Sequence, residues 1–268
     1  MDIYRLEGRK ALVTGGARGF GAGIADAFVK AGADVVIADI LDKEGAATLA
    51  DLKKLGKGKV SFVHHDVTDD GSWEKATAHT IKELGGYDLL INNAGIEVTS
   101  LVIDIDAAQL KKMLDVNIVG TALGMKHAFR AMKPNGPAGK GGTVINIASV
   151  AATIAFPGIA GYSGTKSAVD RMTRIAANES GKLGYGVRVN CVYPGLVATE
   201  MGLKLANDMV TVGLAPDVQS AVGGVVAATP LGRLGEVRDM ADAIVFLASD
   251  AARFITGIGL PVDGGMGM

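Results

Sequence analysis

The sequence predicts an α/β protein with a doubly wound parallel sheet of about seven strands and helices on both faces. Short apolar runs alternate along the chain with longer amphipathic segments, the pattern of strands joined by right-handed helical crossovers. The runs are apolar throughout, as expected for strands covered on both sides. The 268 residues show no linker, composition break or repeat, so we expect one Rossmann-like domain over 1–268.

Each expected strand is a short apolar run. These runs lie at 11–14, 35–38, 60–64, 89–92, 144–148 and 187–192, with 259–262 as a weaker candidate. The helices expected between them are amphipathic segments at 20–31, 43–55, 70–85, 107–132, 161–182 and 237–249.

Composition excludes several classes of function. Hydrophobic residues make up 49% of the chain and charged residues 21%, which excludes bulk disorder. The net charge of −1 and the lack of a polybasic run argue against a nucleic-acid or membrane-surface partner. The N-terminus has no apolar signal core, and the longest uncharged stretch, 141–165, carries too many polar residues for a transmembrane helix.

Cysteine and histidine usage limits the chemistry further. Cys191 is the only cysteine, so no disulfide can form within the chain, and a reducing cytoplasm fits. Its position inside an apolar run indicates a small buried hydrophobic residue rather than a nucleophile. The four histidines show no metal-ligand spacing, so we expect no metal site.

A glycine-rich turn joins the first expected strand to the first helix, with the spacing Gly-x-x-x-Gly-x-Gly over Gly15, Gly19 and Gly21. Glycines there permit a tight turn and let backbone N–H groups approach a pyrophosphate at the helix N-terminus. Any tight strand–helix turn could use such glycines, but the position after the first strand favours a nucleotide.

Acidic residues follow the second and third strands. Asp39 could accept hydrogen bonds from adenosine ribose hydroxyls and would repel a 2′-phosphate, which favours NAD over NADP. Arg18 in the glycine-rich turn argues the other way, and a helix cap or a surface charge is the alternative for Asp39. Asp66, followed by Val67, could meet the adenine amino group, although helix capping by Asp66 or Thr68 is equally consistent with the sequence.

Ser149 follows an expected strand, and Tyr162 and Lys166 lie four residues apart in an expected helix. Positions i and i+4 share a helix face, so the phenol and the ammonium would point the same way. A phenol, with its ordinary pKa of about 10, needs a nearby ammonium to lower that pKa for proton exchange near neutral pH. Alone, this spacing also fits one helical turn with a solvated lysine. Asn117, a poor choice inside an apolar helix, indicates a polar task.

Taken in order, these features resemble the short-chain dehydrogenase/reductase family over essentially the whole chain. The residues that carry the resemblance are Thr14, Gly15, Gly19, Gly21, Asp66, Asn92, Asn93, Ala94, Gly95, Asn117, Ser149, Tyr162, Lys166, Pro194, Gly195, Val262, Asp263, Gly264 and Gly265. Each motif is modest alone, and their common order and spacing make the signal specific.

The resemblance implies a catalytic tetrad of Asn117, Ser149, Tyr162 and Lys166. Tyr162 would exchange a proton with the substrate oxygen, which Ser149 would hold. Lys166 would lower the pKa of Tyr162 and bind the nicotinamide ribose. Asn117 would hold a helix irregularity and a proton-relaying water. With all four present, a non-catalytic dinucleotide-binding scaffold is the less favoured alternative.

The expected cofactor is NAD. Besides Tyr162 and Lys166, its expected binding residues lie in the glycine-rich turn and at the strand ends: Gly15, Arg18, Gly19, Phe20, Gly21, Asp39, Ile40, Asp66, Val67, Asn93, Ala94, Gly95, Pro194, Gly195, Val197 and Thr199.

The substrate side is expected in a lid at about 197–230, which is rich in apolar residues and suits a bulky hydrophobic substrate. These residues could equally pack the lid on the core or on a neighbouring subunit. The expected substrate contacts are Ser149, Ala151, Ile154, Tyr162, Leu196, Met201, Met209 and Leu214. Glu97, near the mouth of this site, has no assigned role.

The predicted function is therefore hydride transfer between NAD(H) and a secondary alcohol or ketone of aromatic, alicyclic or steroid character. The alternative enzyme is an NADPH-dependent 3-oxoacyl thioester (acyl-carrier) reductase. The resemblance also implies a homo-oligomer, a dimer or tetramer, that pairs through 107–132, 161–182 and the last strand.

Overall fold

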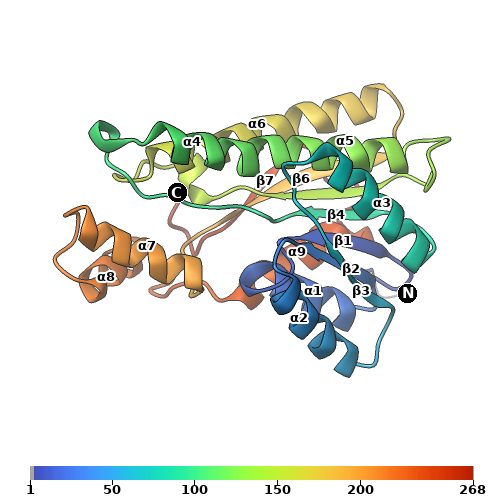
Figure 1. Ribbon diagram of the computed structural model, residues 1–268, viewed down its shortest axis with the longest axis horizontal. Helices are drawn as coiled ribbons and strands as arrows, with labels where there is room; N and C mark the ends of the chain where they lie inside the picture. The colour runs from blue at the N-terminus through green and yellow to red at the C-terminus, as the bar shows by residue number, and fades with distance from the viewer. Residues whose placement is uncertain (1–2, 268) are drawn as a thin grey trace.

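The computed structural model describes residues 3–267 and contains one parallel sheet of seven strands (Figure 1). The strands are β1 (Lys10–Thr14), β2 (Asp34–Asp39), β3 (Val60–His64), β4 (Leu89–Asn92), β5 (Gly142–Ile147), β6 (Val187–Pro194) and β7 (Gly259–Val262). Their order is β3-β2-β1-β4-β5-β6-β7, with all neighbours parallel, so the winding reverses between β1 and β4. This confirms the predicted fold class, including the weaker strand at 259–262.

Helices cover both faces of the sheet (Figure 1). One side holds α1 (Gly19–Lys30), α2 (Asp42–Lys54) and α9 (Val237–Ala248). The other holds α3 (Asp70–Leu84), α4 (Ala107–Leu114), α5 (Gly120–Met132) and α6 (Ala160–Lys182). Short 3₁₀ turns lie at Val102–Asp104, Val150–Ala152 and Asp250–Ala252.

The strands are apolar throughout because successive side chains enter different halves of the core. Leu12 and Leu90 pack towards Trp73 of α3, whereas Val13 and Ile91 pack towards the α1 and α9 side. All five side chains are fully buried. Burial of one such side chain contributes roughly 1.5–3 kcal/mol, so the two layers together hold the sheet rigid beneath its loops.

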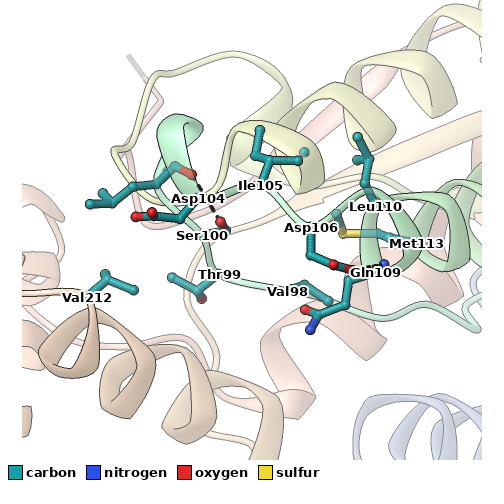
Figure 2. A pocket seen from close by; sticks show the side chains of 12 residues that line it. Val98, Thr99, Ser100, Asp104, Ile105, Asp106, Gln109, Leu110, Met113 and Val212 are labelled. Carbon is teal, nitrogen blue, oxygen red and sulfur yellow. Dashed lines mark hydrogen bonds between the residues drawn. The ribbon is translucent and has the colours of Figure 1, made fainter.

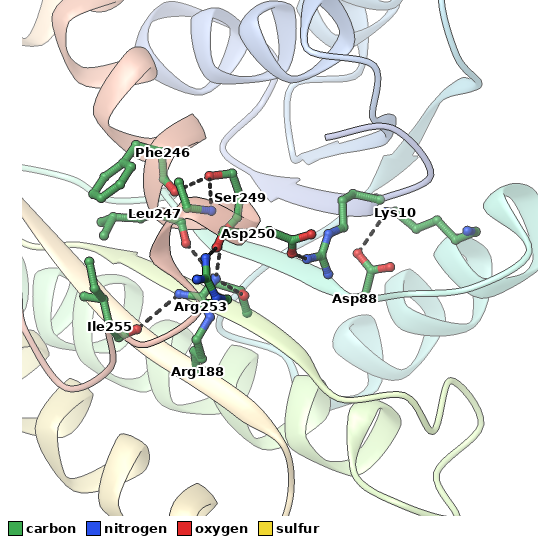
Figure 3. A network of polar contacts seen from close by, with 12 residues as sticks. Lys10, Asp88, Arg188, Phe246, Leu247, Ser249, Asp250, Arg253 and Ile255 are labelled. Carbon is green, nitrogen blue, oxygen red and sulfur yellow. Dashed lines mark hydrogen bonds and ion pairs between the residues drawn. The ribbon is translucent and has the colours of Figure 1, made fainter. Parts of the chain in front are cut away.

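A polar cluster centred on Arg188 closes the amino-terminal end of β6 (Figure 3). Its guanidinium donates to the carbonyls of Leu247 at 2.8 Å and Ile255 at 3.1 Å, and to Thr143 Oγ1 at 2.9 Å. The Leu247 carbonyl belongs to the last turn of α9, where helix carbonyls lack partners within the helix. This cluster therefore fixes α9 against the edge of the sheet opposite the strand ends that carry the motifs.

The helices differ from the sequence prediction in two places. The segment 107–132 is interrupted by a π-helical turn at Asp115–Val119, which separates α4 from α5. The segment after β6 folds into α7 (Glu200–Thr211) and α8 (Val218–Ala228), which project together from the body (Figure 1). The sequence predicted an apolar lid there but no helices.

Residues 3–267 contain neither a membrane-spanning helix nor a cluster of metal-ligating side chains. No helix in that range is long and apolar enough to cross a bilayer. No group of three or more histidine, cysteine, aspartate or glutamate side chains in the same range is placed to hold a metal ion.

Candidate active site

The motif residues converge at the carboxyl ends of the parallel strands, where ligands of doubly wound folds bind. Asn92 ends β4, Ser149 follows β5 and Pro194 ends β6. Tyr162 and Lys166 enter from the first two turns of α6, which begins eleven residues after Ser149. Local helix geometry and sheet topology together place Ser149, Tyr162 and Lys166 around one point.

Lys166 is held from inside the protein. Its residue is 5% exposed, and Nζ donates to the carbonyl oxygen of Ile147 at 2.7 Å. The same Nζ lies 5.5 Å from the centroid of the Tyr162 ring, which confirms that the two side chains share a face. Burial lowers the pKa of the Lys166 ammonium to about 8, so its charge can change within the working range of an enzyme.

The pKa of Tyr162 differs from the sequence prediction. Burial raises it to about 12, the hydrogen bond with Ser149 lowers it, and the charge of Glu97 raises it further. Lys166 is not among the groups that shift this pKa, so the expected lowering by Lys166 is not seen. Ser149 Oγ also accepts a hydrogen bond from the Ala151 N–H at 3.1 Å, which fixes the serine rotamer.

Asn117 lies inside the π-helical turn, so the helix irregularity expected at this residue is present. Its Oδ1 accepts from the Ile96 N–H at 2.9 Å, and its Nδ2 donates to the Ile96 carbonyl at 2.9 Å. Nδ2 also donates to Thr165 Oγ1 at 3.0 Å. Asn117 thus ties the loop after β4 to α6, beside Lys166. The role of Thr165 as a hydrogen-bond acceptor for Asn117 was not predicted from the sequence. The only signal for it is a hydroxyl side chain directly before Lys166.

The glycine-rich turn has the shape that a pyrophosphate needs. A Cβ on Gly15 would lie 2.9 Å from Ala94 Cα, so only glycine lets the turn approach the loop after β4. Gly19 has φ +55°, and a Cβ there would have no atom within 4 Å, which leaves open space at the start of α1. No side chain caps α1 among the described residues, so its first N–H groups suit an anion. The turn therefore fits a dinucleotide.

Asp39 is fixed against this turn. One carboxylate oxygen accepts from the Ala17 N–H at 3.0 Å and the other from the Leu41 N–H at 3.1 Å. The helix-cap alternative is wrong, because Leu41 is the N-cap of α2. Arg18 is engaged elsewhere, with its guanidinium 2.7 Å from the Glu200 carboxylate at the start of α7. Both observations place a carboxylate, and not a free arginine, beside the end of β2.

Asp66 does not cap a helix. Its carboxylate accepts from the backbone N–H of Thr68 at 2.9 Å and from the Thr68 hydroxyl at 2.8 Å. The N-cap of α3 is Asp69, which accepts from the Ser72 N–H. The alternative of capping by Asp66 or Thr68 is therefore wrong, and Asp66 forms a tight turn at the end of β3.

The other expected cofactor residues also lie at this edge of the sheet. The backbone N–H groups of Asn93 and Ala94 both donate to Thr14 Oγ1 at 3.1 Å, which joins the ends of β4 and β1. Thr199 Oγ1 accepts from the Gly202 N–H at 3.3 Å and so caps α7. The remaining residues line the same edge or its loops: Phe20, Gly21, Ile40, Val67, Gly95, Pro194, Gly195 and Val197.

The expected substrate residues of the lid region and of the loop after β5 lie in three places. A Cβ on Gly158 would lie 2.9 Å from Leu214 Cδ1 and 3.6 Å from Met209 Sδ, so both lid residues reach the loop before α6. Met201 is 44% exposed at the start of α7, and Leu196 lines a separate cavity of about 390 Å³ under α7 and α8. Ala151 and Ile154 follow Ser149 in the adjoining loop.

A second cavity, of about 240 Å³, lies between the loop after β4 and the end of α7 (Figure 2). Thr99 and Val212 face each other across it, and Gly161, next to Tyr162, forms part of its wall. Its lining is mixed, with Ile105 and Leu110 beside polar groups. Val212, just after α7, therefore lies across the cavity from a surface that begins one residue from the candidate acid.

The doubly wound sheet, the glycine cradle and the Ser149, Tyr162 and Lys166 group define a nicotinamide-dinucleotide oxidoreductase. The family model described as enoyl-(acyl carrier protein) reductase matches residues 15–267. The chain is 38% identical over 266 residues to trans-4-hydroxycyclohexanecarboxylate dehydrogenase of Sinomonas cyclohexanicum, covering 97% of this chain and 93% of the relative. It is 39% identical over 264 residues to (+)-borneol dehydrogenase 2 of Salvia officinalis, covering 97% and 90%.

A solved short-chain type dehydrogenase/reductase from Mycobacterium marinum matches with a TM-score of 0.88 and 30% identity, covering 99% of this chain and 98% of that one. The chain belongs to the short-chain dehydrogenase/reductase family. The resemblance inferred from the motifs is thereby confirmed.

Proposed function

We propose that this protein transfers a hydride between NAD(H) and a secondary alcohol or ketone that is bulky and hydrophobic, such as an alicyclic, aromatic or steroid compound. The observation that carries the cofactor choice is Asp39, held at the end of β2 by the Ala17 and Leu41 N–H groups. A carboxylate there accepts from ribose hydroxyls and repels a 2′-phosphate.

In the proposed reaction the nicotinamide supplies or accepts the hydride. Tyr162 donates its phenolic proton to the carbonyl oxygen during reduction and takes the alcohol proton during oxidation. Ser149, fixed by the Ala151 N–H, donates a hydrogen bond to the same oxygen. Lys166, whose Nζ lies 5.5 Å from the centroid of the Tyr162 ring, would bind the ribose of the cofactor beside the candidate acid. Asn117 holds the loop after β4 against α6 through its hydrogen bonds to Ile96 and Thr165.

The raised pKa of Tyr162 supports a preferred direction for proton transfer. A phenol with a pKa of about 12 is almost fully protonated at neutral pH, which suits proton donation to a carbonyl. Alcohol oxidation needs the phenolate, so its rate should increase with pH. Ketone reduction is therefore the activity to test first near neutral pH.

The substrate class rests on the lid and on the relatives. Met209 and Leu214 bring apolar surface to the loop before α6. Two relatives are named for alicyclic alcohols, trans-4-hydroxycyclohexanecarboxylate and borneol. Apolar pockets with few polar groups bind such rings well.

The deciding experiment measures oxidation of NADH and of NADPH against bulky cyclic ketones and an acetoacetyl thioester. Turnover of cyclic ketones with NADH supports the proposal. Preference for the thioester with NADPH would instead support the 3-oxoacyl thioester reductase, and binding of dinucleotide with no turnover would support a non-catalytic scaffold. The homo-oligomeric state and the cytoplasmic location remain predictions of the sequence.

A further inference from the structure

Glu97 is a buried carboxylate with one oxygen that accepts no hydrogen bond. It follows Gly95 by two residues, and its side chain is 3% exposed. Oε1 accepts from Thr99 Oγ1 at 2.8 Å. Oε2 has no hydrogen-bond donor among residues 3–267, and Lys204 Nζ of α7 lies 3.7 Å from it. Burial is the main cause that raises the pKa of Glu97.

This carboxylate lies on the substrate side of the reacting groups. Its charge raises the pKa of the Tyr162 phenol. The chain just before it passes the catalytic amine, because a Cβ on Gly95 would lie 3.5 Å from Lys166 Nζ. Thr99, its hydrogen-bond donor, approaches Gly158 from the same side as Leu214 and Met209 of the lid region. Glu97 is therefore set between the candidate acid and the expected substrate lid.

The ion pair with Lys204 of α7 does not satisfy the buried Oε2 of Glu97. Lys204 also pairs with Asp208, one turn further along α7, in a closer contact than the one with Glu97. At 3.7 Å the ammonium is too far to donate a hydrogen bond to Oε2. Two carboxylates and one ammonium leave a net charge of −1 on this group. A buried carboxylate oxygen without a donor is destabilising unless a ligand supplies one.

We propose that Glu97 Oε2 accepts a hydrogen bond from a hydroxyl of the substrate, placed on the far side of the ring from the reacting carbon. This deepens the proposed function and rests on it: the preferred substrates are hydroxyketones and the corresponding diols. The net negative charge disfavours a substrate with a carboxylate at that position, such as the compound for which the Sinomonas relative is named. Oε2 would thus favour substrates that carry a hydroxyl at this position over those that carry a carboxylate.

The test compares kcat/KM for paired ketones with NADH. The probes are 3- and 4-hydroxycyclohexanone and a hydroxylated decalone, each with its deoxy analogue, plus 4-oxocyclohexanecarboxylate. A hydrogen bond to a charged group corresponds to roughly a 10- to 150-fold preference for the hydroxylated member of at least one pair. The ratio within a pair cancels any effect of the Glu97 charge on Tyr162, because both ketones react at the same phenol.

Three variants locate the effect. Glu97→Leu should bring the ratio of that pair to about 1, and the isosteric Glu97→Gln should reduce it roughly tenfold while improving use of 4-oxocyclohexanecarboxylate. Asp208→Asn, which removes the other carboxylate bound to Lys204, should keep the ratio. Turnover without preference in any pair, or a preference that survives in Glu97→Gln and Glu97→Leu, would overturn the inference. If no ketone reacts with either nucleotide, the proposed function fails and this inference fails with it.

Discussion

Replacing Asp39 with alanine should change the enzyme's nucleotide preference, because this carboxylate lies where the adenosine ribose would bind. Its two oxygens accept from the N–H groups of Ala17 and Leu41, so the carboxylate is held in one place even without the nucleotide. Removal of the side chain eliminates both an acceptor for the ribose hydroxyls and a negative charge that opposes a 2′-phosphate.

The expected change in nucleotide preference follows from these two effects. A hydrogen bond to a charged group contributes about 1.5–3 kcal/mol, so kcat/KM for NADH should fall by roughly 10- to 150-fold. Relief of repulsion between two partly solvated charges adds roughly 1–2 kcal/mol in favour of NADPH. The ratio of NADPH to NADH efficiency should therefore rise by at least about 70-fold. The loss of two backbone hydrogen bonds should also cost about 1–3 kcal/mol of stability.

The assay is the initial rate of reduction of one cyclic ketone at varied NADH and NADPH, with unfolding curves to separate stability from specificity. Asp42→Ala is the matched control, since Asp42 is 68% exposed and pairs with His64 at the surface. This control should keep the wild-type ratio. Equal use of NADPH and NADH by the wild type, or an unchanged ratio in Asp39→Ala, would refute the role of Asp39.

Four further predictions concern the candidate acid and the fold. Tyr162→Phe should reduce kcat by roughly 10²- to 10⁴-fold and leave NADH binding, followed by its fluorescence, intact; full activity would refute the mechanism. The rate of alcohol oxidation by the wild type should increase with pH above 7, since the phenolate fraction of a group with a pKa of about 12 rises throughout that range. Arg188→Met should destabilise the protein by about 3–5 kcal/mol in urea unfolding, because it leaves the Leu247 and Ile255 carbonyls without this donor. Burial lowers the pKa of His65 to about 4, so the unfolded state binds the proton first, and stability should fall by about 1.4 kcal/mol per pH unit between pH 6.5 and 4. His65→Gln should lose less stability over this pH range. The same pH dependence in this variant and the wild type would contradict the role of His65.

Sequence patterns located the strands well because a doubly covered strand must be apolar along its whole length. The run 259–262, weak as a pattern, is a strand because β6 offers it a parallel partner. The pattern at 107–132 predicted one helix, and Asn117, a buried polar residue within it, lies in the π-helical turn that divides it. Helices α7 and α8 were not predicted because the whole segment was interpreted only as an apolar lid. The pattern of α7 is amphipathic at the helical period and could have indicated a helix, whereas α8 has a weaker pattern and no buried residue.

The sequence predicted the relative placement of those expected site residues that lie close together in the chain. Tyr162 and Lys166 share a face of α6, since a separation of four residues is nearly one helical turn. Capping was harder to predict, because Asp66, Thr68 and Asp69 are three polar candidates within four residues and only the backbone selects Asp69. The Ile147 carbonyl, which accepts from Lys166 Nζ, carries no sequence signal for its role.

The sequence by itself determined the order of the strands, the glycine-rich turn and the spacing of the catalytic group, all of which depend on near neighbours in the chain. Tertiary structure decided which charges meet. Arg18 pairs with Glu200, 182 residues away, and Lys204 approaches Glu97 from the lid helix. It also decided the pKa of Tyr162, because the desolvation of a phenol depends on every segment packed around it, whatever the distance of that segment along the chain.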